Sequence, residues 1–148
     1  MVYYSYEEFV RDVKRLVKIS SDYDADCLVA IARGGLTLGH AYASATNNRY
    51  IMSINSILYE GSQKSQVCEV FNIPDLSKTK KVLILDDIID SGETMKEVLK
   101  VLNSNYPLVK FKIASLFYKK TALIKPDYTL HEANEWIEFF WEKDYLID

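Results

Sequence analysis

Two adjacent acidic residues, Asp86 and Asp87, directly follow the strand expected at 81–85, whose residues 82–85 are all apolar. Neighbouring carboxylates at the end of a buried strand repel each other, so another group must compensate their charge. A divalent cation or the hydroxyls of a sugar would do so. The pair therefore indicates a binding site for one of these groups.

The residues after the acidic pair form a short turn that could hold a phosphate. Ser91 and Thr94 supply hydroxyls, and Gly92 lets the backbone approach closely, at the start of a helix expected over 91–103. Free N–H groups at a helix N-terminus bind anions. An acidic pair beside such a turn indicates a ligand with a ribose and its 5′-phosphate. The alternative is that Asp90 or Ser91 only caps the helix.

A second candidate anion site follows the apolar run 27–32, at Arg33-Gly34-Gly35. The planar guanidinium of Arg33 suits phosphate oxygens, and glycines let backbone N–H groups approach a ligand. The alternative for Arg33 is a surface salt bridge. The glycine patterns G-x-x-x-x-G-K and G-x-G-x-x-G are both absent, which excludes two common nucleotide-binding loops.

The elements that must position these residues alternate between strands and helices. Ser5 and Glu8 have capping-box spacing and start a helix over 6–19. The further expected elements are strands at 27–32, 50–57, 81–85 and 111–117 and helices at 36–46 and 91–103. This alternation predicts a single α/β domain over 1–148 with a mainly parallel, twisted sheet flanked by helices. Ligands of such sheets bind outside the carboxyl ends of the strands.

Composition narrows the function classes. The chain has 148 residues, 26% of them charged, and a net charge of −3, which argues against a protein built to grip nucleic acid. Two cysteines favour a reduced, cytoplasmic protein. No signal peptide is visible and no apolar run approaches the ~20 residues that span a bilayer, so we expect no stable membrane insertion. Aromatic residues reach 13%, a surplus that needs an explanation.

Three segments resemble one enzyme family. Residues 82–94 resemble the phosphoribosyl pyrophosphate signature of type I phosphoribosyltransferases: an apolar strand, two acids and a T-G-x-T turn, in which Ser91 replaces the first threonine. Residues 29–36 resemble the pyrophosphate loop of bacterial xanthine-guanine phosphoribosyltransferases. Trp136-Ile137-Glu138, with Trp141 beyond, is similar to their purine-binding tail. The resemblance implies the type I phosphoribosyltransferase fold, with a flexible active-site loop over 58–79 and a small C-terminal purine-binding hood over 118–148.

The resemblance also implies roles on the ribose and phosphate side. Asp86 and Asp87 would bind the ribose hydroxyls, directly or through Mg²⁺, and Asp87 is the metal-associated member. Asp90 would be the catalytic residue, a general acid/base at the purine N7. Arg33 and Gly34 would contact pyrophosphate, after a non-proline cis peptide at Ala32–Arg33. The other expected substrate-binding residues of the segment are Ile88, Ile89, Ser91, Gly92, Glu93 and Thr94.

On the base side, the resemblance implies that Lys119 donates to the 6-oxygen of the purine, with the adjacent Lys120 as the alternative. Trp136 would stack on the base, and the backbone of Ile137 would contact its edge. The alternative for Trp136 is a place in the core. Lys64 would act in the loop 58–79, which in the family folds over the reacting centre.

The leading function is thus purine salvage: phosphoribosyl pyrophosphate and a 6-oxopurine, guanine, xanthine or hypoxanthine, give a nucleoside 5′-monophosphate and pyrophosphate. The family also suggests a homodimer or homotetramer. Two alternatives remain open. One is a non-catalytic, nucleotide-sensing regulator of the same fold that binds RNA, against which the net charge of −3 argues. The other is a phosphoribosyltransferase for a non-purine base.

Overall fold

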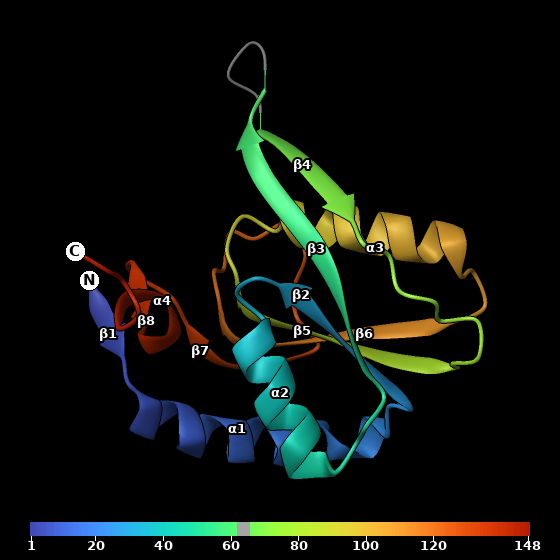
Figure 1. The fold of residues 1–148 in the computed structure, drawn as a ribbon, viewed down its shortest axis with the longest axis horizontal. Coiled ribbons are helices and arrows are strands. Elements are labelled where there is room, and N and C mark those ends of the chain that lie inside the picture. The colour runs from blue at the N-terminus through green and yellow to red at the C-terminus, as the bar shows by residue number, and fades with distance from the viewer. Residues whose placement is uncertain (62–65) are drawn as a thin grey trace.

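The computed structural model describes residues 1–61 and 66–148. A six-stranded sheet with the order β4-β3-β2-β5-β6-β7 forms its centre, and a two-stranded sheet, β1-β8, lies beside it (Figure 1). The elements in chain order are β1 (Val2–Tyr4), α1 (Tyr6–Ser20), β2 (Cys27–Ala32), α2 (Leu36–Thr46), β3 (Ile51–Glu60), β4 (Gln66–Phe71), β5 (Lys81–Ile89), α3 (Glu93–Asn105), β6 (Lys110–Tyr118), β7 (Tyr128–Glu132), β8 (Ile137–Phe139) and α4 (Phe140–Lys143).

The composition of the two central strands, β2 and β5, requires the sheet to be covered on both faces. All six residues of β2 are buried, as is the apolar part of β5, because both are continuous apolar runs. β2, β3, β5, β6 and β7 pair in parallel, and only β4 runs antiparallel. The expected α/β class with a mainly parallel sheet is confirmed.

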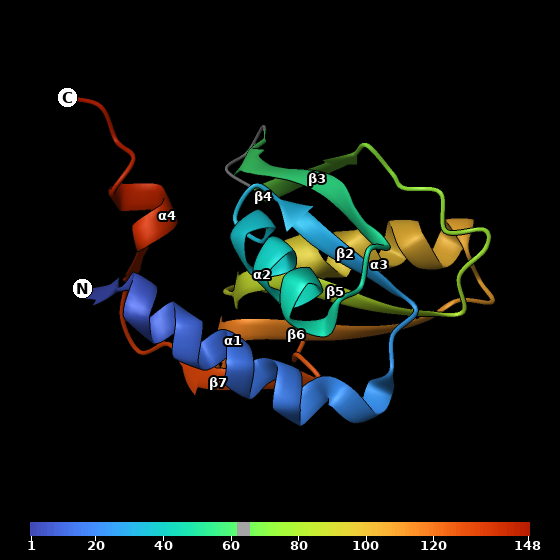
Figure 2. The ribbon, with the colours of Figure 1, turned by 60° about the horizontal axis from the view of Figure 1, so that its bottom comes forward.

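The helices cover the two faces unequally. α1 and α2 lie on one side of the sheet and α3 on the other (Figure 2). The expected capping box opens α1: the Glu8 N–H donates to Ser5 Oγ at 3.1 Å, and the Ser5 N–H donates to the Glu8 carboxylate at 2.9 Å. No helix of the described residues is long and apolar enough to cross a membrane.

The segment 58–79 differs from the long loop expected there. β3 continues to Glu60, and Gln66–Phe71 forms β4, so much of the segment is an antiparallel hairpin at the sheet edge. Residue 61 and residues 72–80 lie outside the helices and strands. β4 escaped prediction because its side chains are exposed or half-buried, and an edge strand needs no continuous apolar run.

The expected C-terminal unit over 118–148 is divided between two sheets. β7 belongs to the central sheet, whereas β8 pairs in parallel with β1 at the other end of the chain, Val2 opposite Ile137. We call β1, β8, α4 and the adjoining Trp136 together the hood. Its aromatic rings pack on α1: Trp141 stacks on Phe139 at 4.6 Å between centroids and meets Phe9 edge-on at 5.2 Å. Part of the aromatic surplus therefore builds the hood.

Candidate active site

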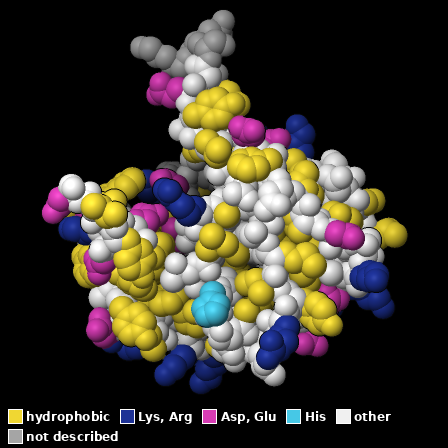
Figure 3. Space-filling view, in the orientation of Figure 1, with side chains coloured by type: hydrophobic (Ala, Val, Ile, Leu, Met, Phe, Trp, Pro, Cys, Tyr) yellow, Lys and Arg dark blue, Asp and Glu magenta, His cyan; other side chains and the backbone are white. Residues whose placement is uncertain are grey.

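A cavity of about 630 Å³ opens at the carboxyl ends of β2 and β5, between the hood and the hairpin. In the space-filling view the surface is hollowed beside the hood, with acidic and basic side chains at the rim (Figure 3). Most of the predicted site residues line this one space, although they come from four separate parts of the chain. Those that do are Arg33, Gly34, Asp86, Asp87, Ile88, Asp90, Thr94, Lys119, Trp136 and Ile137.

The acidic pair lies inside β5 rather than after it, because β6 continues to pair with β5 as far as Ile89. Asp87 is 6% exposed, and its Oδ1 accepts the Ile88 N–H at 2.8 Å. Burial and the neighbouring carboxyl raise the pKa of Asp86 well above its ordinary value. Burial also raises the pKa of Asp87, to about 6. Without a compensating cation, the pair therefore holds protons at a pH where ordinary aspartates are charged.

The loop after β2 approaches the acidic pair closely. The peptide bond between Ala32 and Arg33 is cis, as the family resemblance implied. A Cβ added at Gly34 would lie 2.5 Å from Asp87 Oδ2 and 3.0 Å from Oδ1, so any larger residue here would displace this carboxylate. Arg33 is exposed at the cavity and forms no ion pair with a described residue, which argues against the salt-bridge alternative.

The turn between β5 and α3 has the geometry of an anion cradle. A smaller cavity of about 240 Å³ is lined by Ile89, Ser91, Gly92 and Thr94, among others. Gly92 has φ +87°, and a Cβ there would lie 2.8 Å from the backbone nitrogens of residues 123 and 124. The N–H groups of the first helical turn have no partner within α3. The Glu93 N–H donates to Ser91 Oγ at 3.2 Å, and the Glu93 side chain does not line either cavity.

Asp90 and Lys119 form an ion pair at the wall of the cavity. Lys119 Nζ lies 2.8 Å from Asp90 Oδ1, and both side chains remain partly exposed to the cavity. Lys119 is held at this place because its N–H donates to the Ile89 carbonyl at 2.9 Å. Lys120 instead pairs with Glu132 at 3.5 Å and does not line the cavity. The geometry therefore favours Lys119 over Lys120.

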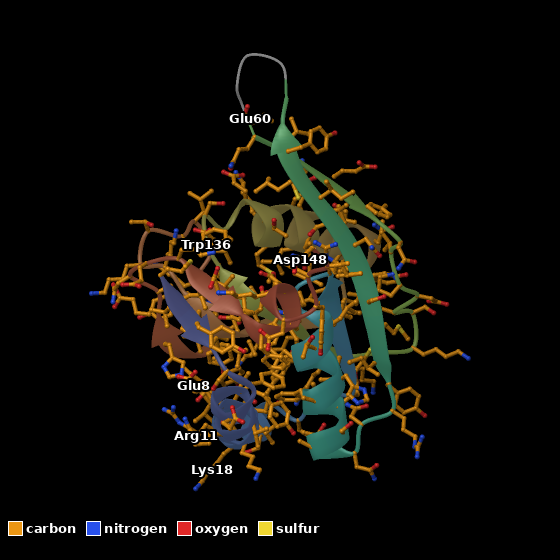
Figure 4. All side chains as sticks on the ribbon, turned by 60° about the vertical axis from the view of Figure 1, so that its left-hand side comes forward. Glu8, Arg11, Lys18, Glu60, Trp136 and Asp148 are labelled. Carbon is orange, nitrogen blue, oxygen red and sulfur yellow. The ribbon has the colours of Figure 1, made fainter. Side chains whose placement is uncertain are left out.

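Trp136 and Ile137 present different groups to the cavity. The Trp136 side chain is 67% exposed, so the core alternative is wrong. Figure 4 shows it in the hood, far from the Glu8, Arg11 and Lys18 side chains of α1. The Val2 N–H donates to the Trp136 carbonyl at 2.9 Å, with Val2 opposite Ile137. In a parallel ladder, the N–H and C=O of Ile137 then point away from β1.

Some residues of the cavity were not foreseen. Glu142 from α4 and Asn55 and Ser56 from β3 also line it. Glu142 follows the W-x-x-x-x-W pattern directly, which was the available signal, whereas nothing in the sequence singled out the two β3 residues. Lys64 lies outside the described residues.

Comparison with known proteins agrees with this geometry. The family model described as "Phosphoribosyl transferase domain" matches residues 3–147. Xanthine-guanine-hypoxanthine phosphoribosyltransferase from Helicobacter pylori is 40% identical, with a TM-score of 0.89 over 97% of this chain and 94% of that one. Purine phosphoribosyltransferase from Pyrococcus horikoshii is 26% identical, with a TM-score of 0.83 over 99% and 97% of the two chains.

A curated relative is hypoxanthine/guanine phosphoribosyltransferase from Methanocella paludicola, 31% identical over 110 residues. The match covers 70% of this chain but spans only 57% of that relative's length. Because the family model covers nearly the whole chain, these findings establish the family without deciding the substrate. The chain belongs to the phosphoribosyltransferase family and has the type I phosphoribosyltransferase fold.

Proposed function

We propose that this protein is a purine salvage enzyme that transfers the phosphoribosyl group of phosphoribosyl pyrophosphate to guanine, xanthine or hypoxanthine. The products are the nucleoside 5′-monophosphate and pyrophosphate. The observation that carries the proposal is a single cavity shared by the acidic pair, the Arg33 loop, Lys119 and an exposed indole. The names of the Helicobacter and Methanocella relatives support the same class of base.

The residues that line the two cavities suggest one orientation for the proposed substrates. The 5′-phosphate takes the turn at Ser91–Thr94, where the first N–H groups of α3 have no acceptor within the helix. The ribose hydroxyls reach Asp86 and Asp87, and the pyrophosphate reaches Arg33 and the backbone of Gly34. The purine stacks on Trp136, while Lys119, Asp90 and the backbone of Ile137 contact its edge.

The acidic pair also fits Mg²⁺. A cation would offset the burial and repulsion that raise the pKa of both carboxyls. Among the residues that the structure describes, no three His, Cys, Asp or Glu side chains gather as a metal cage. Mg²⁺ suits such a site because it combines one or two carboxylates with substrate oxygens and water. When bound through Asp87, it would neutralise charge on the leaving pyrophosphate.

The chemistry follows from these positions. The bond from the ribose C1 to pyrophosphate breaks, a bond from C1 to a purine nitrogen forms, and positive charge develops on the sugar. Arg33 stabilises the departing pyrophosphate, Asp90 accepts the proton that the purine N7 releases, and Lys119 donates to the 6-oxygen. No covalent nucleophile is needed, so catalysis consists of alignment, electrostatic stabilisation and proton transfer.

The test is turnover of each of the three bases with phosphoribosyl pyrophosphate and Mg²⁺, followed by chromatography of the nucleotide product. We expect nucleotide from at least one base. The proposal fails if none reacts while the folded protein still binds phosphoribosyl pyrophosphate. Turnover of a non-purine base, without quenching of tryptophan fluorescence by any purine, would identify the alternative transferase.

The proposal includes two properties beyond the reaction. We expect a homodimer or homotetramer in the cytoplasm. Size-exclusion chromatography with light scattering measures the molar mass of the assembly and so tests the expected number of subunits. Salt-dependent binding of RNA without turnover of any base would instead identify the regulator of the same fold.

A further inference from the structure

Asp12 places a carboxylate on the buried face of α1. It shares this face with Phe9, Val13 and Leu16, and the residue is only 5% exposed. Burying an ionised carboxylate is costly unless hydrogen bonds or opposite charges compensate it, so aspartate is almost never fully buried without partners. The position therefore requires donors inside the protein.

Three side chains supply these donors. Tyr4 Oη lies 2.7 Å from Asp12 Oδ2, His131 Nε2 lies 2.7 Å from the same oxygen, and Arg15 Nη1 lies 3.3 Å from Oδ1. A charged carboxylate only accepts, so the Tyr4 hydroxyl donates and the Nε2 of His131 carries its proton. Burial and the Asp12 carboxylate raise the pKa of Tyr4 above its ordinary value, which keeps this hydroxyl protonated.

Two of the donors belong to the two chain connections that join the hood to the rest of the protein. Tyr4 is the last residue of β1, the strand that pairs with β8. His131 lies near the end of β7, and β8 is the next strand along the chain. In Figure 2, β1 and α4 lie together beyond the first turn of α1, to one side of the sheet. One carboxylate on α1 therefore holds both connections.

The hydroxyl of Tyr4 is not explained by the packing of its ring. The ring meets Phe117, Phe139 and Trp141 edge-on, at 5.2, 5.7 and 6.0 Å between centroids. A phenylalanine would make the same contacts without bringing an O–H group into the core. The hydroxyl therefore serves the bond to Asp12, which joins the aromatic cluster of the hood to α1.

The place of the hood decides where the proposed contacts to the base lie. Val2 of β1 donates its N–H to the Trp136 carbonyl at 2.9 Å and lies opposite Ile137. Trp136 and Ile137 both line the cavity of the candidate active site. A shift of the hood would thus move both residues relative to Asp90 and Lys119, which follow strands of the central sheet.

We propose that Asp12 is a positioning residue for the purine base: through Tyr4 and His131 it fixes both connections of the hood. A buried polar network whose members are all paired makes the structure around it rigid. None of these three residues lines the cavity, so their effect on the base passes through Trp136 and Ile137. The inference rests on the proposed function for the identity of the ligand, whereas the fixing of the hood does not depend on it.

Tyr42 supplies a matched control for the Tyr4 hydroxyl. Its hydroxyl is also buried, 2.6 Å from Ser20 Oγ, but this bond joins α2 to the end of α1 rather than to the hood. Tyr4→Phe should raise KM for the base about fivefold, a part of the value of one hydrogen bond to a charged group, and leave KM for phosphoribosyl pyrophosphate within about twofold. Tyr42→Phe should lower Tm to a similar extent without changing either KM by more than about twofold.

A conservative exchange at His131 separates its hydrogen bond from its packing. The ring of His131 also packs on Phe117, at 5.1 Å between centroids. His131→Gln places an N–H donor at the same reach and should keep KM for the base within about twofold of the wild type, whereas His131→Leu should raise it as Tyr4→Phe does. A KM for the base raised equally by both exchanges would mean that only the ring packing matters, and it contradicts the role of Asp12.

Hydrogen–deuterium exchange tests the fixing of the hood without any ligand. The amides of β8 should exchange faster in Tyr4→Phe and His131→Leu but not in Tyr42→Phe, because only the first two release the hood. Unchanged exchange in Tyr4→Phe, or an equal increase in Tyr42→Phe, overturns the proposal. Faster exchange with an unchanged KM for the base overturns the positioning role alone. Since the exchange measurement needs no turnover, it decides whether Asp12 fixes the hood even if the proposed reaction fails.

Discussion

The two sides of the candidate site are built in opposite ways. The phosphoribosyl side comes from the contiguous segment 82–94 and the Arg33 loop, on the buried strands β2 and β5. The base side comes from the hood, in which β1 and β8 pair across nearly the whole length of the chain. A contiguous motif fixes its own geometry through one strand, one turn and one helix. The hood acquires its geometry only through long-range packing.

The difference predicts that changes on the two sides affect different substrates. Variants of the segment 82–94 and of Gly34 should impair catalysis or the use of phosphoribosyl pyrophosphate. Variants of the exposed hood surface should impair the use of the base. The predictions below test this division, in order of decreasing effect.

The largest effect should come from Asp90→Asn. Loss of a general acid/base lowers kcat by roughly 10²–10³-fold. Stability should change by less than about 1 kcal/mol, because the ion pair with Lys119 is partly exposed. Glu132→Gln is the matched control, since Glu132 pairs with Lys120 outside the cavity. A kcat within twofold of the wild type in Asp90→Asn removes Asp90 from this role.

Gly34→Ala should weaken the use of phosphoribosyl pyrophosphate by roughly 10–100-fold in kcat/KM. The added methyl displaces the Asp87 carboxylate, which would otherwise lie 2.5 Å from it, and misplaced reacting groups cost about 10²-fold. The measurement is initial rates at varied phosphoribosyl pyrophosphate and saturating base. Unchanged kinetic constants in a folded Gly34→Ala variant would mean that the close approach of Gly34 to the Asp87 carboxylate is not needed for the use of phosphoribosyl pyrophosphate.

Trp136→Ala should raise KM for the base about tenfold, because stacking of a base on an aromatic ring contributes roughly 1–3 kcal/mol. KM for phosphoribosyl pyrophosphate should stay within about twofold. Tm should not fall, since the side chain is 67% exposed. Trp136→Phe, which keeps a smaller ring, should recover most of the affinity. If both substrates are affected equally, the division between the two sides fails.

The smallest effect should be on stability without substrate. Burial raises the pKa of Asp87 to about 6 and that of Asp86 above 3.8. The folded protein thus keeps protons that the unfolded chain releases near pH 4, and this stabilising contribution is lost as the pH rises through about 6. Asp86→Asn should flatten this dependence of the free energy of unfolding on pH, because it removes one of the two carboxyls whose pKa burial raises. Urea unfolding between about pH 4.5 and 7.5 measures the free energy of unfolding of the wild type and the variant. If this free energy changes with pH in the same way in both proteins, the raised pKa of the acidic pair is not the cause of the pH dependence.

The sequence predicts the phosphoribosyl side well because its signals are local. The apolar runs at β2 and β5 and the turn chemistry of Ser91, Gly92 and Thr94 each act within a few residues. The strand end at Asp86 was misplaced, because pairing with β6 carries β5 on to Ile89. No property of the segment itself reveals that pairing.

The hood and the hairpin were harder to predict because their structure depends on partners. β1 has three residues, and its strand conformation comes from β8. β4 has exposed and half-buried side chains at a sheet edge and lies in a mostly polar segment, 58–79, which therefore resembled a loop. Trp136 was predicted to stack on the base, whereas Glu142 gained its place in the cavity only through the fold.

The pairing of β1 with β8 also has a consequence for synthesis on the ribosome. Val2–Tyr4 leave the exit tunnel before the central strands, whereas their partner strand, Ile137–Phe139, is translated after all of them. The nascent chain can therefore assemble its central strands, and with them the phosphoribosyl side, while the platform for the base is still missing. Base recognition is the last part of the site to be made.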